Sequence, residues 1–343
     1  MNRILAAVII LAVAACGPGV VGPNPEGDPE EIFDQFWEAY DRYYAHFELK
    51  GVDWDAVYDE HRPRVGPDTD DEVLFEVLSD MIAELEDGHV YLVGDGQRSL
   101  SNSELRSSRR DFDAAVVRDQ YVDEWAEPTN GEFFYGVIDG NIGYLRLATL
   151  SGGQGVGDRV RGWIEQVEEA MEQLEETEAM VVDLRNNSGG RAFNARFLAG
   201  LFATEQRTFM VTRSRNGPDH DDFTDPVEWQ AEPNDTVSYD NPVVVLTNRR
   251  TFSAAEWLTL ALRQYDHVVH MGTHTGGGLA MFLPRQLSNG WMHTVSVQDA
   301  RCPEGRSFER VGIPPQQYLE NGSEELENGT DRVLEDAVEF LRR

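Results

Sequence analysis

The spacing of apolar residues predicts helices in the first part of the chain. Between residues 30 and 65, and again from Val73 to Leu85, apolar side chains recur every three or four positions, as on one buried helix face. Gly88 suits a helix C-terminus, so His89 is expected just past the second helix, before a strand at residues 90–93. Residues 30–93 are therefore predicted to form an N-terminal helical region.

The pattern changes further along the chain. Residues 94–131 are polar and irregular and are predicted to be a linker or surface loop. From residue 132, short apolar strands alternate with amphipathic helices, which predicts an α/β core over residues 132–343, with a mostly parallel sheet and right-handed crossovers. The strands are expected at 133–138, 142–147, 179–184, 208–212, 242–246, 267–271, 280–283 and 291–297, and the helices at 157–176, 192–202, 257–262 and 331–341.

The N-terminus has the features of an export signal. Residues 4–15 are apolar, too few to span a bilayer but typical of a signal-peptide core, and small residues precede Cys16. This pattern resembles a bacterial lipobox. We expect a signal peptide at residues 1–15, a lipidated Cys16 that binds the membrane, and a Gly/Pro-rich tether at residues 16–29. The alternative is a plain secretory signal with a chance cysteine.

Charge and composition narrow the possible functions. The net charge of −33 opposes nucleic-acid binding, so no nucleic-acid partner is expected. It fits either salty surroundings or cationic substrates, and the sequence does not decide between them. Lys50 is the only lysine, so a catalytic lysine would have to be Lys50. Cys302 is predicted to be structural, and the oligomeric state is left open.

The most informative turn carries Ser253. The apolar run 242–246 predicts a buried strand and residues 257–262 a helix, so Ser253 lies where a strand turns into a helix. Such a turn exposes a side chain beside backbone N–H groups, which is what a serine nucleophile needs to attack a carbonyl. The alternative is purely structural, because Ser253 and Glu256 also match a helix capping box.

A second turn is expected to meet the first. Residues 186–190 follow the strand at 179–184, and the carboxyl ends of parallel strands gather at one edge of a sheet. The Gly189-Gly190 pair lets backbone N–H groups approach a ligand closely. Together with the N–H of Ala254, it would supply two donors to an oxyanion.

These motifs, in this order, resemble those of the tail-specific (C-terminal processing) and tricorn-type serine peptidases. The motifs are Leu85-Glu-Asp-Gly-His-Val-Tyr-Leu92, Asp183-Leu-Arg-Asn-Asn-Ser-Gly-Gly190, Thr251-Phe-Ser-Ala-Ala-Glu256 and Gly272-Thr-His-Thr-Gly-Gly277. Residues 37–40 and 52–55 resemble the helical region of the tricorn-like branch. The likeness covers residues 30–343 and implies a crotonase/ClpP-like core of repeated ββα units. The interval 92–133 is too short for the PDZ module of some members, so none is expected.

The resemblance also implies roles for individual residues. Ser253 would be the nucleophile, and Gly189 or Gly190 together with Ala254 would form the oxyanion hole. One branch uses a Ser–Lys dyad, which is excluded because no lysine follows Lys50. The other branch uses a histidine, which points to His89 as general base.

The remaining assignments are less constrained. The resemblance nominates Glu309, which precedes Gly312-Ile-Pro314, as the group that orients the histidine, although Gln316 stands where the family often has Asp. His274 is the rival base, whereas His267 and His270 are predicted to be structural.

The sequence therefore predicts an exported, lipid-anchored serine endopeptidase that cleaves peptide or protein substrates through an acyl-enzyme. No cofactor is expected, and no metal, because no dense set of ligand residues occurs. Two alternatives stay open: a non-catalytic module that binds hydrophobic ligands on the same fold, and an esterase with the same nucleophile.

Overall fold

A computed structural model describes residues 27–102, 111–129, 131–152 and 158–343. The predicted signal peptide, Cys16 and nearly all of the predicted tether lie outside the described residues. No helix in the described ranges is both long and apolar enough to cross a membrane.

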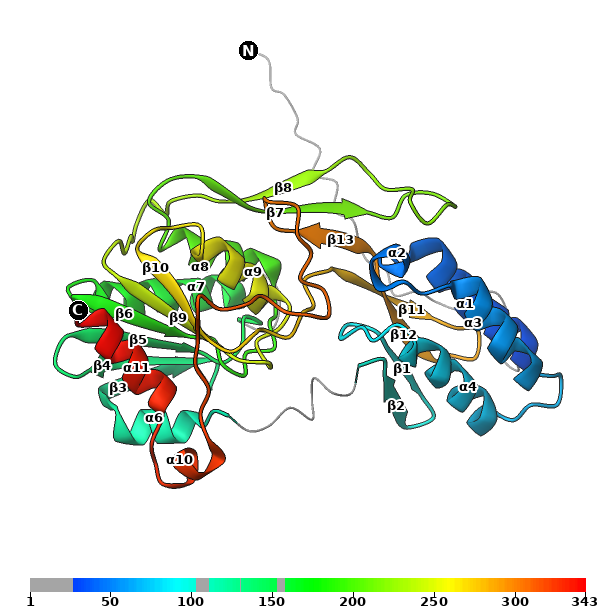
Figure 1. Ribbon diagram of the computed structural model, residues 1–343, viewed down its shortest axis with the longest axis horizontal. Coiled ribbons are helices and arrows are strands. Elements are labelled where there is room, and N and C mark those ends of the chain that lie inside the picture. The colour runs from blue at the N-terminus through cyan, green and yellow to red at the C-terminus, as the bar shows by residue number, and fades with distance from the viewer. Residues whose placement is uncertain (1–26, 103–110, 130, 153–157) are drawn as a thin grey trace, which may run out of the picture.

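Four helices and a short 3₁₀ turn form the N-terminal region (Figure 1). They are α1 (Pro29–Tyr43), α2 (Phe47–Lys50), α3 (Trp54–His61), η1 (Arg62–Arg64) and α4 (Asp71–Ala83). The single periodic stretch 30–65 is broken because Gly51 adopts a left-handed conformation (φ 68°) that ends α2. Asp28 and Asp70 cap α1 and α4 through their side chains, each accepting a bond from a backbone N–H of the first turn.

A small antiparallel sheet covers these helices. Its order is β11 (Phe282–Gln286), β12 (Met292–Ser296), β1 (Tyr91–Gly94) and β2 (Gln97–Leu100). Trp291 and Val295 from the β11–β12 segment are buried in one cluster with Leu74 and Leu78 of α4. The N-terminal region is thus completed by a hairpin from the far end of the sequence (Figure 1), so the unit is not the contiguous block 30–93.

The main sheet has seven strands and is mostly parallel, as predicted. Its order is β14 (Gln317–Tyr318), β10 (Val268–Gly272), β9 (Val243–Thr247), β6 (Ala179–Asp183), β5 (Ile142–Leu147), β4 (Phe133–Ile138) and β3 (Val122–Thr129). Neighbours from β14 to β5 run parallel, and β4 and β3 are antiparallel additions. The carboxyl ends of β5, β6, β9 and β10 therefore meet at one edge.

Helices cover both faces of the main sheet. On one face Val182 packs in a cluster with residues of α7 (Asp158–Leu174), α8 (Ala192–Gly200) and α9 (Ala254–Leu262). On the other, Val181 packs with α6 (Ala114–Gln120) and α11 (Arg332–Leu341). Neighbouring valines belong to different clusters because side chains alternate along a strand. The short helix α10 (Ser323–Glu327) precedes α11.

The prediction of a linker or surface loop over residues 94–131 is wrong for most of its described part. These residues form β2, α6 and β3. β3 lies at the sheet edge and pairs with β4 through two register shifts, so its apolar residues do not alternate regularly. A period-based prediction therefore misses it.

A third sheet links the two halves of the molecule. It contains β13 (Gln298–Arg301), β7 (Arg207–Ser214) and β8 (Val227–Ala231), and β8 is a strand that was not predicted from the sequence. The turn after β7 reaches α1, because Arg215 donates to the carbonyl oxygen of Asp41 at 3.2 Å and His220 contacts the Asp41 carboxylate at 2.8 Å. In Figure 1 this ribbon runs along the top from the core towards the N-terminal helices.

Candidate active site

Ser253 lies at a sharp turn between β9 and α9. Its backbone has a positive φ (φ 57°, ψ −127°), which is rare for a residue with a side chain and costs on the order of 1–3 kcal/mol. Such strain persists only where surrounding contacts fix the backbone conformation. Here Phe252 N–H donates to Asn187 O at 2.9 Å and the Thr251 hydroxyl to Leu184 O at 2.8 Å, which ties the turn to the neighbouring one.

His89 meets Ser253 from the other half of the molecule. Its Nε2 lies 3.0 Å from Ser253 Oγ, although 164 positions separate the two residues. His89 follows α4 and precedes β1, and its carbonyl oxygen accepts a bond from the Thr294 hydroxyl of β12 at 2.6 Å. The small sheet therefore fixes the backbone that carries the imidazole.

Two aromatic rings hold the imidazole of His89. The ring centroid of Phe252 lies 4.6 Å away, and that of Phe282 lies 5.0 Å away in a stacked arrangement. His89 is 6% exposed, and no described residue bonds its Nδ1. Burial lowers the pKa of His89 to about 4, against the opposing effect of the nearby Asp87 carboxylate. The imidazole is therefore neutral at physiological pH.

The turn at residues 186–190 lies directly against the Ser253 turn. Asn186 N–H donates to Asn248 Oδ1, and Asn248 Nδ2 donates back to Asn186 Oδ1, both at 2.8 Å. Gly189 is left-handed (φ 93°), and a Cβ there would lie 2.7 Å from that of Ser253. Only glycine permits this approach of the two backbones.

Of the three predicted oxyanion donors, one is already engaged. Gly189 N–H donates to Asn187 Oδ1 at 2.8 Å. No described residue accepts a bond from the N–H of Gly190 or of Ala254. Gly190 lines the same cavity as Ser253, and Ala254 follows Ser253 at the N-terminus of α9.

Glu256 stabilises the turn that carries Ser253. Its carboxylate accepts bonds from the Thr275 hydroxyl and from the N–H groups of Gly277, Gly278 and Ser253, at 2.6 to 3.1 Å. Burial raises the pKa of Glu256 to about 7, while these donors act in the opposite direction. The capping-box interpretation is thus partly right: Glu256 reaches back to the Ser253 N–H, while the Ser253 hydroxyl faces His89.

A buried charged cluster behind His89 was not found from the sequence. Asp87 accepts a bond from His89 N–H at 2.9 Å and from the Tyr44 hydroxyl at 3.0 Å. Lys50 Nζ lies 3.4 Å and His46 Nδ1 3.5 Å from Asp87 Oδ2. Burial alone would raise the pKa of Asp87, but Lys50 and His46 hold it well below its usual range. The only lysine thus neutralises a buried carboxylate.

Glu309 has different partners from those predicted. Its Oε1 accepts bonds from Leu279 N–H at 2.7 Å and Ala280 N–H at 2.6 Å, and no hydrogen bond joins it to His89 in the described chain. Burial raises the pKa of Glu309. Its contacts hold the segment that leads into β11, so the predicted orienting role has no hydrogen bond to support it.

The rival histidines lie elsewhere. His274 is exposed on the loop after β10, and it does not line the Ser253 cavity. His270 is buried on β10, with Nε2 2.7 Å from the Thr247 hydroxyl. His267 precedes the same strand and lies outside the cavity. Of these histidines, only His89 reaches Ser253.

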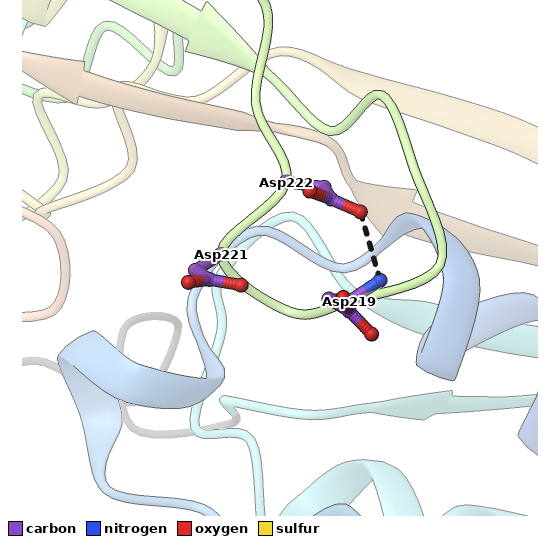
Figure 2. A group of neighbouring side chains, drawn as sticks. All are labelled: Asp219, Asp221 and Asp222. Atoms are coloured by element: carbon purple, nitrogen blue, oxygen red, sulfur yellow. Dashed lines mark hydrogen bonds between the residues drawn. The ribbon is translucent and has the colours of Figure 1, made fainter.

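Three aspartates form the group best suited to a cation among the described residues. Asp219, Asp221 and Asp222 lie on the turn between β7 and β8, with oxygen atoms within 4.8 Å of one another (Figure 2). Asp222 already accepts a bond from the backbone N–H of Asp219 at 3.1 Å. None of them lines the cavity of Ser253, so the chemistry at Ser253 does not draw on this group.

The site as a whole combines a strained serine, a neutral histidine in contact with it, and amide N–H groups beside both. Ser253, His89 and Gly190 line a cavity of about 710 Å³ at the carboxyl edge of the main sheet. This fold and this site define the class of serine hydrolases with a Ser–His pair on an α/β core.

Comparison with known proteins gives the family. The model of peptidase family S41 matches residues 141–319, just over half of the chain, and the tricorn protease C1 domain matches residues 25–83. The chain belongs to peptidase family S41, as its motifs indicated.

Individual relatives agree with this membership. The carboxyl-terminal-processing protease of Synechocystis sp. is 31% identical over 183 residues, which are 52% of this chain and 38% of that protein. The chain thus matches well under two thirds of this relative. The crystal structure of a candidate peptidase from Parabacteroides merdae has a TM-score of 0.82 at 28% identity, covering 92% of this chain and 97% of that chain. Mature CPAF, at 13% identity and a TM-score of 0.70 over 91% and 97% of the two chains, shows the same fold.

Proposed function

We propose that this protein is a serine endopeptidase that cleaves peptide bonds through an acyl-enzyme. The observation that carries the proposal is the 3.0 Å contact between His89 Nε2 and Ser253 Oγ, at a turn whose backbone strain exposes the hydroxyl. Family membership and the carboxyl-terminal-processing relative support peptide substrates. A module that only binds a hydrophobic ligand would not need a histidine in contact with a strained serine.

The reaction follows from the positions of the groups. Neutral His89 accepts the Ser253 proton while Oγ bonds to the carbonyl carbon of the substrate. The oxygen that becomes negative faces the N–H groups of Gly190 and Ala254, which have no other described partner. The tetrahedral intermediate then collapses: the C–N bond breaks, His89 protonates the leaving amine, and water later hydrolyses the ester on Ser253.

Asp87, and not the predicted orienting group Glu309, is the carboxylate that acts on His89. It bonds to the backbone N–H of His89 and raises the pKa of the imidazole, so it stabilises the imidazolium formed during the reaction. Glu309 acts through the backbone of Leu279 and Ala280. The two carboxylates thus have separate tasks.

Covalent labelling tests this function. A fluorophosphonate probe should modify Ser253 stoichiometrically, as located by peptide mass spectrometry, and Ser253→Ala should not be labelled. Unfolded casein should be cleaved as well, which separates a peptidase from an esterase that turns over only p-nitrophenyl acetate. A folded wild-type protein that is not labelled would contradict the proposal.

Export and anchoring form the second part of the proposal. The apolar run before Cys16 supports an exported lipoprotein on the periplasmic or cell-surface side of a membrane. In detergent phase separation, wild-type protein from cells should enter the detergent phase, and Cys16→Ala should move to the aqueous phase. If both variants stay in the aqueous phase, the lipid anchor is wrong.

A further inference from the structure

The cavity around Ser253 has a charge opposite to that of the whole protein. The chain carries 62 acidic and 29 basic residues. Yet the described side chains that line the cavity include Arg98, Arg249 and Arg250 and no aspartate or glutamate. Net charge would favour cationic substrates, whereas the cavity that holds the nucleophile favours anions.

Arg249 is a fixed cation at the wall of this cavity. Its Nη1 donates to Thr275 O at 2.8 Å and Val311 O at 3.1 Å, and its Nη2 donates to Arg310 O at 2.9 Å. Carbonyl groups satisfy its donors without cancelling its full charge, and no carboxylate of the described chain forms an ion pair with it. Its charge therefore contributes to the potential in the cavity.

Arg98 is the second cation at this cavity, and unlike Arg249 it is not held by carbonyl groups of the described chain. It lies on the edge strand β2, and its guanidinium carbon stacks 4.6 Å from the ring centroid of Tyr91, which also lines the cavity. Its side chain is exposed, and no carboxylate in the described ranges pairs with it. Stacking leaves the edge of the guanidinium plane, with its N–H donors, available to a planar carboxylate.

The acidic groups behind the site do not offset these arginines. Asp87 is paired with Lys50 and His46, inside the protein. Glu256 and Glu309 are buried, and burial raises the pKa of each. These carboxylates therefore leave the charges of Arg98 and Arg249 uncompensated in the cavity that a substrate enters.

We propose that the cavity selects substrates with a carboxylate close to the scissile bond, and that Arg98 binds this carboxylate. The inference rests on the proposed peptidase function and names its substrate class: acidic peptides. The carboxylate has two possible sources, a Glu or Asp side chain and the C-terminal carboxylate of the peptide. A guanidinium pairs with either source through two parallel hydrogen bonds.

The test compares matched peptides. One set of synthetic peptides carries Glu, Gln or Lys at each position in turn, and every peptide is made with a free and with an amidated C-terminus. Rates of cleavage, followed by mass spectrometry at about 0.15 M ionic strength, give kcat/KM for wild type, Arg98→Gln and Arg98→Glu. Arg285→Gln is the matched control, because Arg285 also stacks 4.6 Å from a tyrosine ring, that of Tyr43, but does not line the cavity.

We expect wild type and Arg285→Gln to prefer Glu over Gln peptides by about tenfold in kcat/KM, as for one charged hydrogen-bonded contact. Arg98→Gln should reduce this ratio to near one, and Arg98→Glu should prefer Lys. If amidation of the C-terminus lowers kcat/KM of the wild type and the Glu to Gln change does not, the terminal carboxylate is the group that Arg98 binds.

Failure of this inference differs from failure of the proposed function. Three results would overturn acidic selection alone, provided that Ser253 is labelled. The wild type could prefer Gln or Lys peptides, the preference for Glu could persist in Arg98→Gln, or none of the peptides could be cleaved. The wild-type comparison needs no variant, so it holds whether or not a variant folds. Absence of labelling at Ser253 would overturn the peptidase assignment instead.

Discussion

At the scale of single residues, reactivity depends on keeping one imidazole neutral. His89 is enclosed by Phe252 and Phe282, and this desolvation outweighs the neighbouring carboxylate of Asp87. A neutral imidazole can accept the proton of Ser253 without first losing one. The low pKa is therefore useful to the proposed chemistry and also sets its pH range.

The pH dependence of labelling follows from that pKa. The reactive form has neutral His89, so the rate of fluorophosphonate labelling should fall only as the pH drops through about 4, well below the usual value of 6.5 for histidine. The rate constant is measured from pH 3.5 to 8 in short pulses, with circular dichroism as a control for folding. An acid limb near pH 6.5 would show that His89 is not desolvated as described.

Glu256 provides a second test at this scale. In Glu256→Gln one carboxylate oxygen becomes an NH₂ group, which would face N–H donors such as those of Gly278 and Ser253. Two opposed donors in a buried site should lower the free energy of unfolding by about 1–3 kcal/mol and reduce the labelling rate. Urea denaturation measures the first effect. Glu84→Gln is the control, because Glu84 is exposed just after α4. Equal changes in the free energy of unfolding and in the labelling rate for the two variants would contradict a supporting role for Glu256.

At the scale of elements, the turns at residues 186–190 and 251–253 could be predicted because local sequence defines them. A strand, a turn rich in Asn and Gly, and a helix follow one another, and parallel strands bring their carboxyl ends together. The partners of Lys50 could not be predicted in this way. Its role depends on α2 packing against the end of α4, where Lys50 Nζ bonds to Leu85 O at 2.9 Å and lies near Asp87.

This packing predicts a strong effect of Lys50 on stability. Lys50→Met leaves Asp87 buried with one cation fewer, which should cost about 3–5 kcal/mol in the free energy of unfolding at pH 7. The loss should shrink as the pH falls far enough to protonate Asp87 in the folded state, because the low pKa of this group is the source of the stability. Thermal unfolding across pH values gives the measurement.

An exposed pair serves as the control for Lys50. Arg64 bonds to Asp80 at 2.6 Å with both side chains partly in water. Arg64→Met should therefore change the free energy of unfolding by only about 0–1 kcal/mol. Equal effects of the two substitutions would show that the Asp87 cluster is not a buried ion pair in solution.

At the scale of the whole molecule, the site is assembled from two units that share strands. β12 comes late in the chain yet pairs with β1 and packs on the N-terminal helices. The sequence indicated strands at residues 280–283 and 291–297 but not their partners, because strand pairing between distant segments leaves no local pattern. For the same reason Glu309 was assigned to His89, whereas it bonds to Leu279 and Ala280.

Thr294 tests whether this assembly positions His89. Its hydroxyl donates to His89 O at 2.6 Å and accepts from Tyr91 N–H at 3.1 Å. Thr294→Val keeps the shape but removes both bonds, so we expect a loss of about 1–3 kcal/mol in stability and a slower labelling rate. Thr208→Val, on β7, also removes hydroxyl bonds, to Glu228 and Gln230, but away from the site, so it should leave the labelling rate unchanged. A normal labelling rate in Thr294→Val would argue against positioning by β12.

The most direct measurement compares two histidines as the base for Ser253. We expect His89→Ala to lower the second-order rate constant of fluorophosphonate labelling by about 10²–10⁴-fold at pH 7, the usual contribution of a general base. His274→Ala should leave it within about twofold, because His274 is exposed and outside the cavity. A labelling rate that survives in His89→Ala and is lost in folded His274→Ala would contradict the pairing of His89 with Ser253.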